Sequence, residues 1–203
     1  VDIDYCIART NYLRLLFGKH IPVSPPFPGA REALVDLSKD YQILYLTARP
    51  RPMLDRTREW LGYYGFPPGP VIVSDHFDDV LNQLDWKRKI LRELRQRFPA
   101  LLVSFGNRRL DLESALDNRL LPLTLQSVEH DIRPHSGDVL LEDWQDVREF
   151  FRVNRELLCY PQRLDRAMQS GITLLQPVRQ QNGAYRYKPK RLGNHDQSSA
   201  MAD

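Results

Sequence analysis

Short apolar runs alternate with amphipathic segments along the first 155 residues, and this alternation limits the possible folds more than any other feature. Runs typical of strands occupy residues 42–46, 71–73, 101–105 and 121–125, with helical spacing in the stretches between them. Strands joined by right-handed helical crossovers run in the same direction, so this order predicts a parallel sheet. We therefore expect a three-layer, Rossmann-like α/β fold with helices on both faces of the sheet.

The predicted helices divide the chain into a folded part and an extension. We expect helices over residues 30–39, 50–64, 85–98, 111–117 and 142–153, the third one capped by Asp85. Residues 1–4 are typical of the end of a buried strand, which we expect to be cut short at Val1. Residues 1–155 are predicted to form one domain. Residues 156–203 are predicted to be a basic, polar and largely flexible extension, disordered from about residue 183.

Composition and charge exclude several classes of protein. The 203 residues include 29 Lys+Arg and 26 Asp+Glu, but residues 1–150 hold 20 basic and 22 acidic side chains, whereas residues 151–203 hold 9 and 4. The basic surplus therefore lies in the last quarter, which argues against a nucleic-acid binder. No apolar run reaches the ~18–20 residues that span a bilayer. The two cysteines, Cys6 and Cys159, exclude a disulfide scaffold and favour an intracellular protein.

Polar side chains follow the ends of successive predicted strands and begin one of the helices. These residues are Asp2, Asp4, Thr47, Lys87, Asn107 and Asp111. The carboxyl ends of parallel strands meet at one edge of a sheet, where ligands bind, so we expect these side chains to converge. Carboxylate and amide oxygens suit Mg²⁺, and a cation is needed where a carboxylate attacks a phosphomonoester dianion.

Together these residues resemble the haloacid dehalogenase superfamily of phosphotransferases. That superfamily has a DxDx(T/V) motif, a Ser or Thr after the second strand, a Lys, and GDxxxD or a relative of it. The resemblance implies that Asp2 is the nucleophile and Asp4 the general acid and base. It also implies a set of phosphate-binding residues, namely Thr47, Lys87, Ala48 and Arg49. The implied Mg²⁺ site consists of Asp2, Asp4, Asn107 and Asp111.

Within that superfamily, residues 1–125 are similar to the lipin-type catalytic domain. The similarity rests on LTAR at 46–49, MxDxTRxxL at 53–61, PGP at 68–70 and FGNRxxD at 105–111. It implies Mg²⁺-dependent hydrolysis of phosphatidate or a similar anionic lipid by an intracellular protein in peripheral contact with a membrane. Asn107 stands where most relatives have Asp, so we expect weaker Mg²⁺ binding. Tyr5-Cys6 replaces the usual Gly-Thr, and a thiol is a weak donor in that turn.

The spacing of the motifs predicts a fold without a cap domain. Only 42 residues separate Asp4 from Thr47, and 39 separate Thr47 from Lys87. A stable domain rarely has fewer than ~40–50 residues, so neither interval holds a separate cap. We therefore expect an open site that accepts a lipid headgroup, the end of a macromolecule or a phosphoprotein.

Two other functions fit the same residues. A module that binds phosphatidate without hydrolysing it is compatible with Tyr5-Cys6, and a polynucleotide or nucleotide 3′-phosphatase is compatible with Thr47-Ala48-Arg49. The FGNRxxD turn and the net charge of −2 in residues 1–150 argue against the 3′-phosphatase. Arg49 and Arg108 either bind an anionic group or pair with Asp55 or Asp111. Residues 12–19 either contact a membrane or pack onto the domain.

Overall fold

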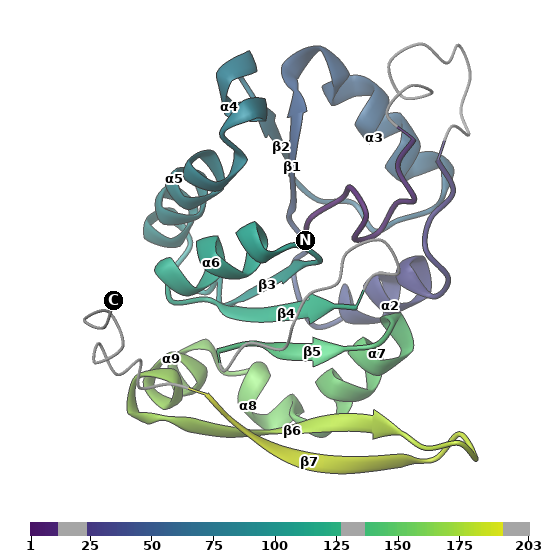
Figure 1. The fold of residues 1–203 in the computed structure, drawn as a ribbon, viewed down its shortest axis with the longest axis vertical. Coiled ribbons are helices and arrows are strands. Elements are labelled where there is room, and N and C mark those ends of the chain that lie inside the picture. The colour runs from purple at the N-terminus through teal and green to yellow at the C-terminus, as the bar shows by residue number, and fades with distance from the viewer. Residues whose placement is uncertain (12–23, 127–136, 193–203) are drawn as a thin grey trace, which may run out of the picture.

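The computed structural model describes residues 1–11, 24–126 and 137–192, and its core is a set of parallel strands. One sheet pairs β1 (Tyr45–Pro50) with β2 (Val71–Ser74), and a second has the order β3 (Val103–Gly106), β4 (Leu121–Leu125), β5 (Val139–Leu141). All of these pairings are parallel. The expected parallel sheet is thus present, in two parts that lie one above the other in Figure 1.

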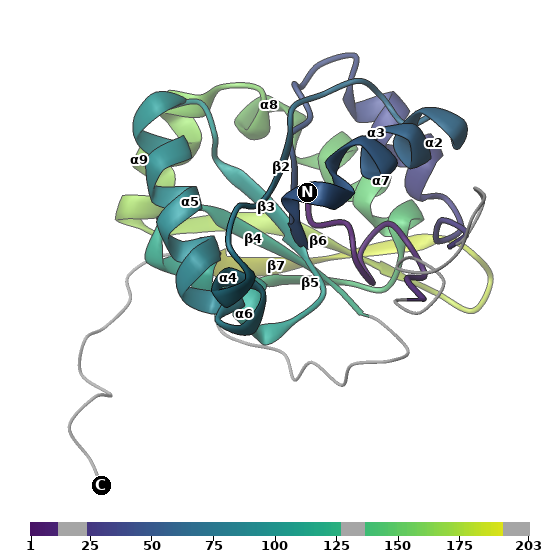
Figure 2. The ribbon, with the colours of Figure 1, turned by 90° about the horizontal axis from the view of Figure 1, so that it is seen from above.

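Helices cover both faces of the strands, which gives the expected three layers (Figure 2). One apolar core contains buried side chains of α2 (Ala30–Leu37), α3 (Leu54–Tyr63) and α7 (Trp144–Val153). A separate core on the other face contains buried side chains of α5 (Gln83–Arg97) and α6 (Arg109–Asp117). The α/β prediction is therefore confirmed. Among the described residues between Asp4 and Lys87, no additional cap domain is present, since they form α2, β1, a 3₁₀ turn (Arg51–Met53), α3, β2 and α4 (Phe77–Leu81).

Some element boundaries differ from the sequence prediction. β1 begins at Tyr45 rather than residue 42 and continues to Pro50, with an irregularity after Leu46. Just before β1, the Leu44 carbonyl accepts a hydrogen bond from the amine of Val1 at 2.7 Å. α5 begins at Gln83, so Asp85 lies in its first turn instead of capping it. An acidic residue there still interacts favourably with the helix dipole.

The last quarter of the described chain has more structure than the predicted flexible extension. α8 (Arg155–Leu158) and α9 (Pro161–Ser170) lead into an antiparallel hairpin of β6 (Ile172–Arg179) and β7 (Tyr185–Leu192). Ile172 and Leu174 alternate into the core and anchor β6 beside the domain. The expectation of disorder from residue 183 is therefore wrong through Leu192. Residues 193–203 lie outside the described part of the chain, and so does the basic-aromatic segment 12–19.

An ion-pair cluster fastens the hairpin to α7. The guanidinium of Arg179 donates to Asp143 at 2.7 Å and to Asp146 at 2.6 Å. Burial works against ionisation of Asp143, but Arg179 and the first amides of α7 outweigh it and lower the pKa of this carboxyl. Asp146 is 1% exposed, and the hydroxyl of Tyr185 in β7 also donates to it at 2.9 Å. The hairpin is thus held by a polar anchor as well as by its apolar side chains.

The first residues of the chain lie between the two parallel sheets, where the N label of Figure 1 stands. The amide of Leu46 donates to the carbonyl of Val1 at 2.9 Å, and the amide of Asp2 donates to the carbonyl of Phe105 at 3.1 Å. Val1 and Asp2 thereby contact β1 on one side and β3 on the other. Asp2 therefore lies between the carboxyl ends of β1 and β3. No helix among the described residues is long and apolar enough to cross a bilayer.

Candidate active site

Three predicted site residues meet in one buried ion cluster. The ammonium of Lys87, in the first part of α5, donates to Asp2 Oδ1 at 2.9 Å and also to Asp111 Oδ1. All three side chains are less than a tenth exposed. Burial raises the pKa of Asp2 to about 7, with Lys87 acting against this shift and Asp111 adding to it. One lysine thus faces two carboxylates, which leaves the cluster with a surplus of negative charge.

The turn after β3 brings Asp111 into this cluster. Oδ2 of Asp111 accepts from the backbone amides of Asn107 at 3.3 Å and Arg108 at 3.1 Å. Gly106 makes this approach possible, because a Cβ at that position would lie 2.2 Å from the Cβ of Asp111. The glycine in the predicted FGNRxxD turn is therefore required by close packing of the turn against the first turn of α6.

Asn107 supplies an amide that has no partner within the described part of the chain. Its side chain is fully buried, and neither its oxygen nor its nitrogen makes a hydrogen bond there. A buried amide without partners is costly, which points to a group that this structure does not contain. No cluster of three His, Cys, Asp or Glu side chains suited to a metal occurs among the described residues. Asn107 falls outside that set of ligand types, however, and Mg²⁺ readily takes one or two carboxylates, with other oxygen ligands completing its shell.

The residues present therefore fit a divalent cation. Asp2 and Asp111 offer buried carboxylate oxygens, and Asn107 offers the unpartnered amide oxygen. The surplus negative charge around Lys87 would be offset by a cation held there.

A second polar cluster surrounds Asp4. Its carboxylate accepts hydrogen bonds from Thr10 at 2.6 Å, from Thr47 at 2.8 Å and from the guanidinium of Arg49, whose closest approach is 2.7 Å. Burial works against ionisation of Asp4, but Arg49 and the two hydroxyls outweigh it and lower the pKa of this carboxyl. Asp4 is thus held as a charged acceptor in this structure.

The structure brings most of the predicted site residues to the carboxyl edge of the parallel strands. The contacts of Arg49, Arg108 and Ala48 are as follows. Arg49 is buried against Asp4 and Thr57, so it pairs with neither of the acids expected for it. The Arg108 guanidinium donates to Gln83 at 3.0 Å. Ala48 packs at the border of the α5–α6 core. A role for Asp4 in binding metal would require its carboxylate to move away from Arg49.

Thr10 is the site residue that the sequence analysis missed. Its hydroxyl donates to Asp4 Oδ1 at 2.6 Å and so helps to hold this carboxylate in place. Cys6 is buried, and the turn around it is closed by amides of residues 6–8 that donate to the carbonyl of Ile3. The signal for Thr10 was weak, because its distance along the chain from Asp4 matches no familiar motif.

We expect Thr10→Val to destabilise the protein by about 1.5 kcal/mol, since a buried carboxylate loses a charge-assisted hydrogen bond without a change in side-chain shape. Urea unfolding followed by circular dichroism measures this loss. Thr173→Val, at an exposed position of β6, is the matched control and should leave the midpoint nearly unchanged. Equal midpoints for both variants would contradict the structural role of Thr10.

Comparisons with known proteins agree with this architecture. Residues 28–118 match the family model described as PITM 1-3, LNS2 domain. The crystal structure of D,D-heptose 1.7-bisphosphate phosphatase from B. bronchiseptica, complexed with magnesium and phosphate, superposes with a TM-score of 0.54. It is 16% identical in sequence, and the match covers 76% of this chain and 96% of that one. No curated protein sequence matches.

The chain has a haloacid dehalogenase fold. The structural match covers 96% of the phosphatase chain, and the predicted site residues lie at the edge of the strands where open α/β sheets bind ligands. The predicted fold is therefore confirmed. The LNS2 match adds that residues 28–118 share their sequence pattern with a described domain, and this segment contains Thr47, Lys87, Asn107 and Asp111.

Proposed function

We propose that this protein is a Mg²⁺-dependent phosphomonoester hydrolase that acts on phosphatidate or a similar anionic lipid. The observation that carries the proposal is the buried group of Asp2, Lys87, Asp111 and the unpartnered Asn107 at the carboxyl edge of the strands. Two carboxylates, one ammonium and a free amide match the needs of a phosphate dianion with its cation. The LNS2 match and the lipin-like motifs at residues 46–49 and 105–111 support the lipid as substrate.

In the proposed reaction, a carboxylate oxygen of Asp2 attacks phosphorus and the bond from phosphorus to the ester oxygen breaks. The leaving alkoxide takes a proton from the carboxyl group of Asp4. Asp4 then takes a proton from water, and the resulting hydroxide attacks the phosphorus of the aspartyl-phosphate. This second step releases inorganic phosphate and restores the carboxylate of Asp2.

The other residues bind and orient the phosphate. Lys87 would bind the equatorial oxygens as a point charge, and the Thr47 hydroxyl would donate to another oxygen. Mg²⁺ held by Asp2, Asn107 and Asp111 would supply the positive charge that lets two anions approach each other.

One observation favours a second candidate, a phosphatidate-binding module without turnover. A general acid must hold a proton, whereas three donors and a lowered pKa keep Asp4 ionised in this structure. Hydrolysis thus requires Asp4 to exchange Arg49 for a substrate oxygen. Binding alone requires no such exchange.

A panel of three substrates tests the proposal. We expect the full chain to release phosphate from phosphatidate in detergent micelles when Mg²⁺ is present, and to lose this activity in excess EDTA. A 3′-phosphorylated oligonucleotide and an aryl phosphate should be hydrolysed at least about tenfold more slowly, a difference of ~1.4 kcal/mol in transition-state binding.

The outcomes separate the three functions. Preferred hydrolysis of the oligonucleotide would identify a 3′-phosphatase. Sedimentation with phosphatidate liposomes but no turnover on any substrate would identify the binding module. Phosphate release that persists in EDTA would contradict the role of Mg²⁺.

A further inference from the structure

The guanidinium of Arg49 is buried at the site but uses only part of its hydrogen-bonding capacity. Nε donates to both oxygens of Asp4 at 3.1 Å, Nη2 donates to Asp4 Oδ1 at 2.7 Å, and Nη1 donates to Oγ1 of Thr57 at 3.2 Å. The side chain is only 2% exposed. A guanidinium carries five N–H groups, so one on Nη1 and one on Nη2 make no hydrogen bond within the described part of the chain. Buried donors without acceptors point to a group that this structure does not contain.

Thr57, near the start of α3, offers Arg49 an acceptor and nothing else. Its hydroxyl donates its single proton to the carbonyl of Met53 at 2.7 Å, so the bond to Arg49 uses a lone pair of Oγ1. Thr57 is 1% exposed, which keeps solvent from competing for that lone pair. The first turn of a helix carries partial positive charge, so a cation is held beside it only where an oxygen faces the cation. This threonine belongs to the MxDxTRxxL motif at 53–61, which the proposed reaction leaves without a role.

The proposed reaction, on which this inference rests, requires Asp4 to release Arg49. A buried cation that loses its only partner is costly, which would oppose the release. The bond from Nη1 to Thr57 does not involve Asp4, so it survives when the carboxylate turns away. The guanidinium then keeps one acceptor, while its other N–H groups can donate to a phosphate oxygen.

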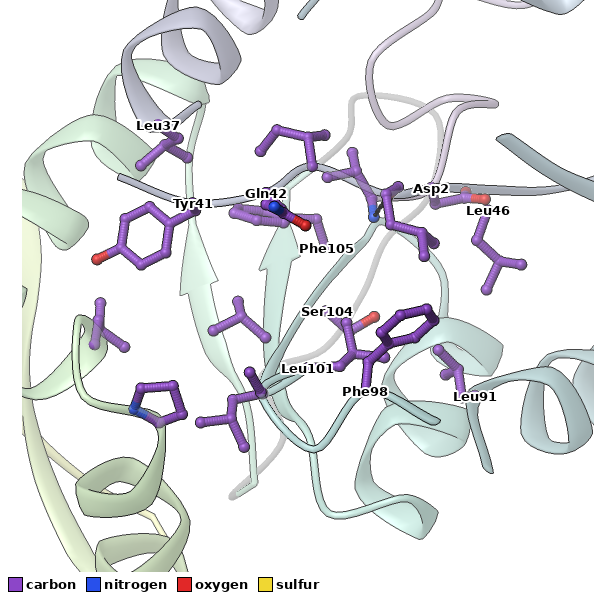
Figure 3. A pocket seen from close by; sticks show the side chains of 18 of the residues that line it. Asp2, Leu37, Tyr41, Gln42, Leu46, Leu91, Phe98, Leu101, Ser104 and Phe105 are labelled. Carbon is purple, nitrogen blue, oxygen red and sulfur yellow. Dashed lines mark hydrogen bonds between the residues drawn. The ribbon is translucent and has the colours of Figure 1, made fainter. Parts of the chain in front are cut away.

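The pocket next to Asp2 offers an anion fewer partners. It has a volume of about 400 Å³ and is lined mostly by apolar side chains, among them Leu46 and Leu91 (Figure 3). Arg49 and Thr57 are not part of that lining. Because an anion in apolar surroundings lacks hydrogen-bond donors, a phosphate at Asp2 gains its additional cation from the side of Arg49.

We propose that Thr57 is a positioning residue that holds one end of Arg49 while the guanidinium transfers from Asp4 to the phosphate of the substrate. In the unliganded protein Arg49 is shared between Asp4 and Thr57, and with phosphate bound it is shared between the phosphate and Thr57. The Thr57 hydroxyl touches no reacting atom and acts only through Arg49.

Binding of inorganic phosphate to the full chain in the presence of Mg²⁺, measured by titration calorimetry, tests this role. Thr57→Val keeps the shape of the side chain but removes the acceptor, and we expect it to weaken phosphate binding about tenfold. Thr57→Ala removes the acceptor without placing a methyl group against Arg49 and should give the same result. Thr57→Ser keeps the hydroxyl and should bind phosphate within about twofold of the unmodified chain. The kcat/KM for phosphatidate should follow the same order.

Arg49→Lys provides the background that isolates the contact between the two side chains. Lysine keeps a positive charge for Asp4, but its single nitrogen does not span Asp4 and Thr57 as the guanidinium does. In this background Thr57→Val should change phosphate binding by less than about twofold. Ser170→Ala is the matched control for a lost helix bond, since Ser170 Oγ donates to the carbonyl of Arg166 at 3.0 Å in α9. It should leave phosphate binding unchanged.

Three results would overturn the proposal. Equal weakening by Thr57→Val in both backgrounds would show that Thr57 acts through the stability of α3 rather than through Arg49. Unchanged phosphate binding by Thr57→Val, or no phosphate binding by the unmodified chain, would exclude the role directly. The expected binding pattern without phosphate release from any substrate would instead reject the hydrolase and leave the positioning of Arg49 intact.

Discussion

Asp2→Asn is expected to lower phosphate release from phosphatidate by at least about 10³-fold, because an amide oxygen does not replace a carboxylate as nucleophile. The same change should leave the free energy of unfolding unchanged or slightly increased. Burial and Asp111 both disfavour the charge on Asp2, and the substitution removes that charge while keeping the shape of the side chain. Loss of turnover without loss of stability is therefore the expected signature.

Phosphate release and urea unfolding of the same preparation provide the two measurements. Asp55→Asn is the matched control, since Asp55 is an exposed acid on α3 that pairs only weakly with Arg58 at 3.6 Å. It should keep both activity and stability. Turnover by Asp2→Asn within tenfold of the unmodified protein would exclude an aspartyl-phosphate on Asp2. Liposome sedimentation that survives the substitution would show that binding and hydrolysis are separable.

Lys87→Met is expected to cost about 3–5 kcal/mol of stability, because it removes the one cation that contacts both Asp2 and Asp111 in the described structure. Both carboxylates would then be buried without their ammonium partner. Urea unfolding measures the loss, and Lys89→Met, at an exposed position of the same helix, serves as control. The destabilisation should shrink at low pH, since protonation of the carboxylates removes the charges that Lys87 compensates.

A double substitution sharpens this test. Asp111→Asn in the Lys87→Met background removes one of the two uncompensated charges and should recover part of the lost stability. Additive effects of the two substitutions would contradict a direct charge interaction. A loss no larger than that of Lys89→Met would show that Lys87 is not the partner of the buried acids.

The sequence predicts much of the fold because strand and helix periods are local properties. The strand at 121–125 matches β4 at both ends, and the helix predicted from residue 30 matches the start of α2. The C-terminal hairpin escaped prediction although Asn182-Gly183 is a known hairpin signal, and Gly183 indeed has φ +81°. The alternation of buried and exposed residues in β6 is limited to Ile172–Leu175, and the polar, basic residues around it are not typical of a strand.

Convergence of the site was predictable from strand ends, but the pairing of its side chains was not. Asp2 and Asn107 lie where parallel strands end, and Asp111 lies in the first turn of the helix that follows β3, so topology alone brings them to one edge. Arg49 could reach several acids along the chain, and only the packed structure selects Asp4. The same holds for Thr10, whose partner depends on how residues 5–8 turn. Roles that depend on side-chain direction therefore need the tertiary structure.

Several of the basic residues in the last quarter of the chain lie along β7, whose outer edge is unpaired in the described structure. Among the described residues, no strand pairs with this edge, which leaves a row of backbone groups able to template another chain. Arg186, Lys188 and Arg191 lie along this strand with Pro189 between them, and like charges together with a missing amide discourage such pairing. The positive charge of these side chains therefore disfavours the pairing of this edge with another strand, whatever the substrate of the protein is.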